Sequence, residues 1–132
     1  MSVRVIHSSQ FYHEGRGSTL VAVHLAGRSA RLKAIDFLLP DVESATEVHH
    51  LRFIKAQTFM FTPEEVEDYA VSEVDWSKTG RGSLVSVGRS RWMSQFSQQH
   101  LGRCEHYRMM FYDELLDVLC EDVLVEGGAY TA

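Results

Sequence analysis

The stretch GRGSTLVAVHLAGRSAR, residues 15–31, has a partial counterpart in GRGSLVSVGRSRW, residues 80–92. Both stretches begin with Gly-Arg-Gly-Ser, continue through an apolar run and reach a Gly-Arg-Ser. Glycine permits the backbone conformations that tight turns need, and alternating apolar residues are typical of half-buried strands. The pattern therefore predicts a turn, a strand and a second turn in each half of the chain.

The two halves share one more pattern, because HLRFI (residues 50–54) follows the first stretch and HYRMM (residues 106–110) follows the second. The shared patterns come in the same order, although the gaps between them differ. We predict one domain over residues 1–132, with residues 1–70 and 71–132 as candidate similar halves that bury a common sheet face. A phosphate-binding loop is disfavoured, because Gly-Arg-Gly-Ser precedes an apolar strand rather than a helix.

The longest strand-like stretch covers residues 46–62 and is apolar on both faces, which indicates a central or a bulged strand. Thr62-Pro63 followed by Glu65 has the composition of a helix start, so we predict a short helix over residues 63–69. Apolar residues at spacing typical of a helix, ended by a glycine, predict another over residues 92–101. The expected fold class is α+β, mainly β: a sandwich or a half-open barrel.

The segment 106–125 fits either a hairpin or a helix. As a hairpin with its turn at residues 114–115, it would place Met109 opposite Cys120 and Arg108 opposite Glu121, which are sensible cross-strand pairs. As a helix, it would gather its acidic residues on one face. Both alternatives stay open at this point.

The composition is that of an ordinary globular domain, with 132 residues, 45% hydrophobic and 23% charged. Two cysteines are too few for a disulfide framework, and the N-terminus lacks an apolar secretion signal, so we expect a cytoplasmic protein without a membrane segment. The net charge of −5 makes nucleic acid an unfavourable partner. Exposed strand edges make a homodimer a reasonable expectation.

Arginine and aromatic residues concentrate between positions 89 and 108, a mixture that recurs at binding surfaces. The predicted binding residues are Arg89, Arg91, Trp92, Arg103, Tyr107 and Arg108. No sequence motif for a nucleophile or for a cofactor loop is present. We therefore expect a non-catalytic protein that binds a ligand or a protein partner, with a regulatory or toxin-neutralising role as one option.

The alternative is a metal-binding protein or an enzyme centred on the sequence HLGRCEH, residues 100–106. His100, Cys104 and His106 are residue types that zinc accepts as ligands. Gly102 interrupts the helix that would bring His100 and Cys104 together, and no fourth ligand is evident. We expect no cofactor under the binding hypothesis and zinc under this alternative.

Overall fold

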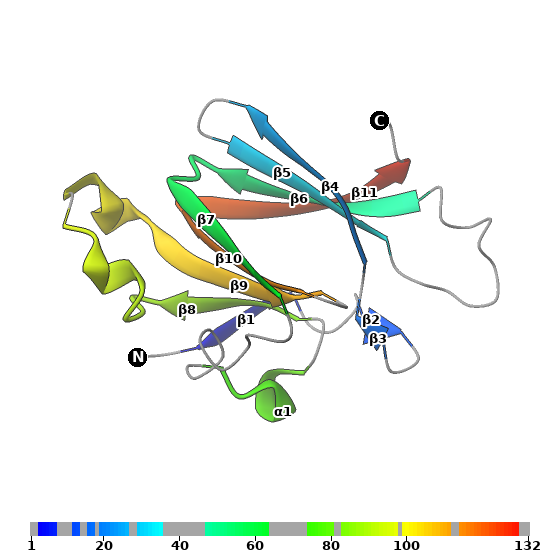
Figure 1. Cartoon of the computed structure of the whole chain (residues 1–132), viewed down its shortest axis with the longest axis horizontal. Helices are drawn as coiled ribbons and strands as arrows, with labels where there is room; N and C mark the ends of the chain where they lie inside the picture. The colour runs from blue at the N-terminus through cyan, green and yellow to red at the C-terminus, as the bar shows by residue number, and fades with distance from the viewer. Residues whose placement is uncertain are drawn as a thin grey trace.

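Two antiparallel sheets facing each other form the body of the protein in the computed structural model (Figure 1). The structure describes residues 3–7, 12–13, 16–17, 19–26, 29–35, 47–63, 74–80, 83–97, 99–111 and 114–129. One sheet has the strand order β1-β8-β9-β10-β7, the other has the order β11-β6-β5-β4, and β2 and β3 form a separate small pair. The strands are β1 Arg4–His7, β2 Tyr12–His13, β3 Arg16–Gly17, β4 Thr19–Ala26, β5 Ser29–Ile35, β6 Glu47–Ile54, β7 Thr58–Pro63, β8 Leu84–Gly88, β9 Glu105–Met110, β10 Glu114–Cys120 and β11 Asp122–Ala129.

A bulged corner joins the two sheets. β6 continues into β7 and β10 continues into β11, so the same two chain segments pair with each other in both sheets. At the corner, residues 55–57 lie opposite only residues 120–121, and Lys55 has a positive φ of 54°. The Gln57 N–H donates to the Leu119 carbonyl at 2.8 Å, which keeps the ladder closed around the extra residue. The stretch 46–62, expected to be a central or a bulged strand, is divided at this corner into β6 and β7, which belong to different sheets.

The strand order is the same in both halves of the chain. In each half, three consecutive strands pair in sequence within one sheet, and the fourth strand crosses to the other sheet. β4 and β8, which carry the apolar runs LVAV and LVSV, are the first of these strands in their halves. The HLRFI and HYRMM patterns do not correspond, because the first lies in β6, a third strand, and the second in β9, a second strand. The duplication of sequence itself stays a prediction.

The main core lies between the sheets and draws on both of them, which makes the protein a mainly β sandwich, as predicted. The sheets do not close into a barrel. Each strand contributes the alternate residues that point inward. The buried members are Leu51, Phe53, Leu84, Tyr107, Met109, Phe111, Leu116, Val118, Cys120 and Val123.

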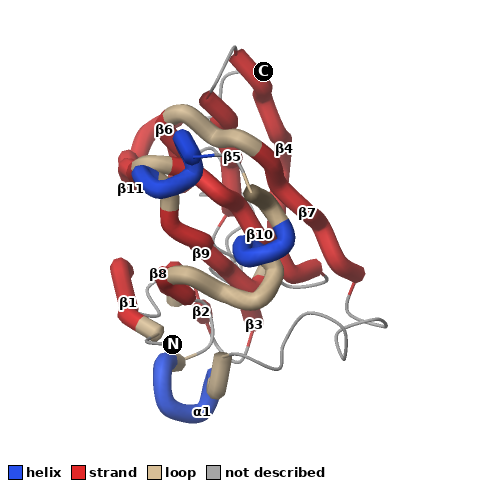
Figure 2. Tube along the Cα trace, turned by 90° about the vertical axis from the view of Figure 1, so that its left-hand side faces the viewer, coloured by secondary structure: helices blue, strands red, loops and turns tan. Residues whose placement is uncertain are grey.

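The helix predicted over residues 92–101 is wrong. This segment forms two 3-10 turns, Met93–Gln95 and Gln99–Arg103, which are the short helical pieces at the near end of the molecule in Figure 2. Phe96 has an extended backbone between them (φ −104°, ψ 134°), so the helical path is interrupted after one turn. The helix predicted over residues 63–69 falls almost entirely on residues 64–73, outside the described residues, and residue 63 belongs to β7. Among the described residues, the one α-helix is the short α1 Trp76–Thr79.

The segment 106–125 is a hairpin with one further strand, not a helix. The predicted register was wrong by four residues along β10, because Arg108 lies opposite Asp117 instead of Glu121. The Phe111 N–H donates to the Glu114 carbonyl at 2.7 Å and closes the hairpin. The observed register gives a buried carboxylate a cationic partner, which the predicted one would not have done. Within the described residues, no helix is long and apolar enough to cross a bilayer.

Candidate functional site

The outward face of the five-stranded sheet carries a buried chain of polar side chains. His106 and Arg108 on β9 and Asp117 on β10 have the strand parity opposite to that of the main core, so they point away from the four-stranded sheet. They are nevertheless buried, and His106 and Asp117 have no exposed surface. The segment 89–103, which we call the turn loop, connects β8 to β9 and supplies the fourth member of the chain, Ser90.

Hydrogen bonds connect the four side chains in series. His106 Nδ1 lies 2.6 Å from Ser90 Oγ, and His106 Nε2 lies 2.5 Å from Asp117 Oδ1. Arg108 Nε donates to the same carboxylate oxygen at 2.5 Å. Because a carboxylate oxygen only accepts, the imidazole proton belongs on Nε2, and Nδ1 accepts from the Ser90 hydroxyl. The series is therefore a complete donor-to-acceptor chain from serine to carboxylate.

The order serine, histidine, aspartate is that of a nucleophilic triad. Two features distinguish this hydrogen-bonded series from a catalytic triad whose serine is accessible to substrate. Ser90 is only 1% exposed, and its Oγ also accepts the Met93 N–H at 3.1 Å, which fixes the first 3-10 turn. The carboxylate of Asp117 is shared with the Arg108 guanidinium. These contacts give the chain a clear structural task, which is to hold the turn loop on the sheet.

The far end of the chain is incompletely bonded. Arg108 Nη1 and Asp117 Oδ2 are buried and have no hydrogen-bond partner within the described part of the chain. Leaving a buried polar atom unpaired costs about 1–3 kcal/mol.

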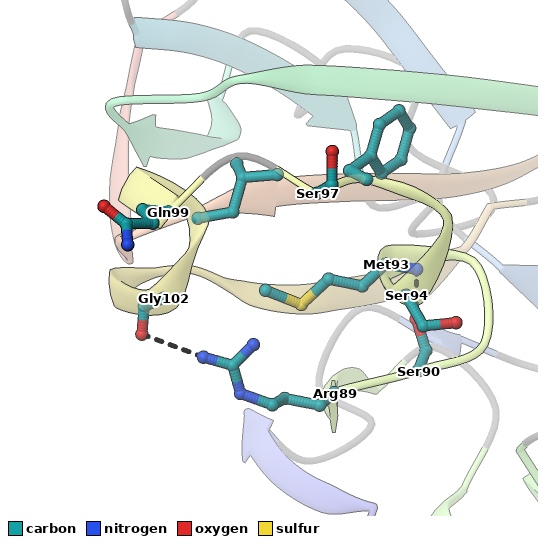
Figure 3. A pocket seen from close by; sticks show the side chains of 9 residues that line it. Arg89, Ser90, Met93, Ser94, Ser97, Gln99 and Gly102 are labelled. Carbon is teal, nitrogen blue, oxygen red and sulfur yellow. Dashed lines mark hydrogen bonds between the residues drawn. The ribbon is translucent and has the colours of Figure 1, made fainter.

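Next to the hydrogen-bonded series of side chains, and including Ser90 in its wall, the turn loop forms a pocket of about 320 Å³ (Figure 3). The Arg89 guanidinium lies along one wall, and its Nη2 donates to the Gly102 carbonyl at 3.1 Å, which ties the two ends of the loop together. Met93 lies in the middle of the pocket lining. Hydroxyl groups and an amide complete the polar part of the wall. The lining residues are Arg89, Ser90, Met93, Ser94, Phe96, Ser97, Gln99, Leu101 and Gly102.

An aromatic series leads from the buried chain to the surface of the turn loop. The Trp92 ring meets the His106 ring edge-on at a centroid distance of 4.9 Å and the Phe96 ring at 6.0 Å. Phe96 is 38% exposed. Trp92 therefore packs against the buried histidine on one side and supports an exposed aromatic ring on the other.

The six predicted binding residues do not share one surface. Arg89, Arg91 and Arg103 are exposed on the turn loop, and Trp92 is half-buried there. Tyr107 and Arg108 lie in the interior, on opposite faces of β9. Burial raises the pKa of the Tyr107 hydroxyl, and the Glu105 carboxylate adds to the shift.

The three predicted metal ligands are not seen to converge. Both ring nitrogens of His106 are engaged, by Ser90 and by Asp117. Cys104 is buried, and this burial is the main cause that raises the pKa of its thiol. The Glu121 carboxylate raises it further, and the raised pKa disfavours the thiolate that zinc requires. The His100 side chain lies outside what the structure describes. Among the described side chains, no three His, Cys, Asp or Glu residues are grouped as a metal site would need.

Sequence reasoning missed Ser90 and Asp117. A signal for Asp117 was present, because it is the one charged residue inside the apolar run LLDVLC, where a strand would bury it unless a cation lay opposite. Testing hairpin registers for such a cation would have placed it opposite Arg108. Ser90 gave no comparable signal, since its role depends on the turn loop folding back over β9.

Comparisons with known proteins assign neither a family nor a function to this chain. The chain matches no protein-family model, no curated protein and no solved structure.

Proposed function

We propose that the protein is a non-catalytic binding protein whose turn loop binds a small ligand that has an anionic group and an apolar or aromatic group. The observation that carries this proposal is the pocket itself, which combines the Arg89 guanidinium and serine hydroxyls with the apolar side chains of Met93 and Leu101. Pockets of this kind place a few polar groups in a mostly apolar lining. The sequence of the turn loop contains three arginines and no acidic residue, so its charge favours an anion.

The contacts that order the turn loop support a role in ligand binding. Ser90 holds the first 3-10 turn, the Arg89–Gly102 bond closes the loop, and Trp92 packs on His106. A site that is already ordered loses less conformational entropy when a ligand binds. The buried hydrogen bonds contribute to this order, because Ser90 connects the turn loop to His106 of β9.

The hydrogen-bond chain also favours a second candidate, acyl transfer with Ser90 as the nucleophile and His106 as the base. A nucleophile has to reach the carbon that it attacks, and Ser90 is 1% exposed. Catalysis would require the first 3-10 turn to open and break the Met93–Ser90 hydrogen bond. The binding proposal needs no such opening, so it is preferred.

The zinc alternative has a direct test of its own. Binding of zinc at His106 would require one of its two ring hydrogen bonds to break. One zinc per chain, lost on Cys104→Ser substitution, would establish that alternative and replace the binding proposal. We expect no stoichiometric zinc.

The binding proposal is tested by ¹⁵N NMR titration with benzoate and with phenyl phosphate, using benzylamine as the cationic control. We expect benzoate or phenyl phosphate to shift the backbone amide signals of residues 89–97 and 99–103, and Arg89→Gln to weaken that response. Lys55→Gln, an exposed change at the sheet corner, is the matched control and should leave the response intact. An equal response to benzylamine, or no response from the turn loop to either anion, would refute the proposal.

A further inference from the structure

Two hydroxyl groups in the lining of the turn-loop pocket are restricted to accepting hydrogen bonds from a ligand. Ser94 Oγ donates its proton to the Arg91 carbonyl at 2.7 Å. Ser90 Oγ donates to His106 Nδ1, because the other ring nitrogen donates to Asp117. Since each hydroxyl has one proton and has already given it to a partner inside the protein, its oxygen has only lone pairs left to offer.

The cationic donor of the lining is the Arg89 guanidinium. Its Nη2 donates to the Gly102 carbonyl at 3.1 Å, which engages one of the five N–H donors that a guanidinium carries. In Figure 3 the guanidinium reaches Gly102 at one end of the pocket, while Ser90 and Ser94 lie toward the other end. Met93 lies between the two ends. The pocket therefore has a cationic donor end, an apolar middle and an acceptor end.

The donor end suits an anion with a single negative charge. Among the described lining residues, Arg89 is the one charged side chain. A guanidinium and a carboxylate match in shape and can form two parallel hydrogen bonds, so a carboxylate fits one arginine well. A phosphate monoester carries close to two negative charges, and such groups are typically bound by clusters of arginines.

The acceptor end requires a hydrogen-bond donor on the ligand, and a neutral amide N–H fits it better than an ammonium group. The sequence of the turn loop contains three arginines and no acidic residue, so an ammonium group would meet positive charge without a carboxylate of the loop beside it. An amide N–H carries no charge, and a hydroxyl oxygen satisfies it. A ligand that combines a carboxylate, an apolar group and amide N–H groups therefore matches all three parts of the pocket.

We propose that the ligand of the turn loop is the C-terminal end of a polypeptide whose last residue is apolar. The terminal carboxylate binds Arg89, the last side chain lies against Met93 and Leu101, and the chain N–H groups point to the acceptor end. An extended chain advances about 3.3–3.6 Å per residue, so the last one or two residues span the pocket. Its volume of about 320 Å³ lies at the lower end of the range of about 300–1,000 Å³ for ligand pockets, which agrees with so short a segment. The inference rests on the proposed function, because it names the ligand class of the same pocket.

Isothermal titration calorimetry of the full chain with four small probes tests the inference. We expect N-acetylglycylleucine to bind about tenfold more tightly than its C-terminal amide, which lacks the negative charge. It should bind about fivefold more tightly than 4-methylpentanoate, which keeps the carboxylate and the leucine side chain but lacks the amide N–H groups. Free leucine, in which an ammonium group replaces the amide, should bind more weakly than N-acetylglycylleucine.

Variants assign the two polar ends of the pocket separately. Ser94→Ala removes an exposed acceptor, so it should weaken binding of N-acetylglycylleucine about threefold and leave the affinity for 4-methylpentanoate unchanged. The unchanged affinity for 4-methylpentanoate also shows that the turn loop of this variant is folded. Arg89→Gln should weaken binding of both carboxylates, and Lys55→Gln is the matched control that should affect neither.

The failure of this inference is distinguishable from the failure of the proposed function. Equal affinity for N-acetylglycylleucine and its C-terminal amide, or for N-acetylglycylleucine and 4-methylpentanoate, would overturn the inference and leave the binding of benzoate as it is. Binding of phenyl phosphate without binding of any carboxylate would overturn it in the same way. If none of the carboxylates and phosphates bound to the turn loop, the proposed function would be refuted, and this inference with it.

Discussion

Replacing Arg108 with methionine should destabilise the protein severely. Asp117 is fully buried and shares its Oδ1 between Arg108 and His106. Without the guanidinium, the carboxylate keeps only the His106 imidazole among the described side chains, at a site with no exposed surface. Breaking a buried ion pair from one side typically costs about 3–5 kcal/mol. The free energy of unfolding of a domain is about 5–15 kcal/mol, so this loss is at least about a fifth of it.

Urea denaturation followed by tryptophan fluorescence measures the effect. With a slope of about 1–3 kcal/mol per molar urea, the midpoint of Arg108→Met should fall by about 2 M. Arg103→Met is the matched control on the exposed turn loop, and its stability should change by no more than about 0.5 kcal/mol. The double variant Arg108→Met, Asp117→Leu removes both charges and should recover part of the loss, because no carboxylate is then left unpaired. A loss of less than about 1 kcal/mol for Arg108→Met alone would refute the reasoning, because a buried ion pair broken from one side cannot cost so little.

Ser90→Ala removes both the acceptor of a backbone N–H and the partner of a buried histidine, so unfolding should become easier by about 1–3 kcal/mol, as urea titration would show. Cys104 and Cys120 are buried, with raised thiol pKa values, so an aromatic disulfide reagent at pH 8 should react with them only in urea; rapid reaction of the native protein would contradict their placement. The raised pKa of the Tyr107 hydroxyl and of both thiols keeps these groups protonated in the folded state after the unfolded chain has begun to lose its protons, so stability should be full below about pH 8.5 and fall as the pH rises above it. Lys55→Gly should stabilise the corner by up to about 1 kcal/mol, because glycine adopts a positive φ without strain, whereas Lys55→Val should destabilise it.

The strands were the part of the fold that sequence could predict. The period-two patterns of residues 18–25 and 84–87 correspond to β4 and β8. In residues 46–62, Leu51 and Phe53 of β6 belong to the main core, and Phe59 and Phe61 of β7 pack against it with the same parity. The strand order could not be predicted, because it depends on which edges meet across the corner. Periodicity alone also failed at residues 92–101, where one extended residue, Phe96, interrupts a helical spacing.

The candidate site was only partly predictable for a similar reason. Arg89, Arg91 and Arg103 stand out as charges in a basic segment, and they are exposed. Arg108 stood out equally, but its surroundings depend on a hairpin register that sets it against Asp117. A local pattern cannot distinguish an arginine of the surface from one that neutralises a buried carboxylate on the next strand.

The central claim is that the chain Ser90–His106–Asp117 holds the turn loop in place and carries out no reaction. Treatment of the native protein with a fluorophosphonate, followed by intact mass measurement, tests it most directly, because this reagent labels a serine only where a base activates it and the reagent can reach it. We expect no adduct on the folded protein. A stoichiometric adduct that Ser90→Ala abolishes would contradict it and would establish Ser90 as a nucleophile.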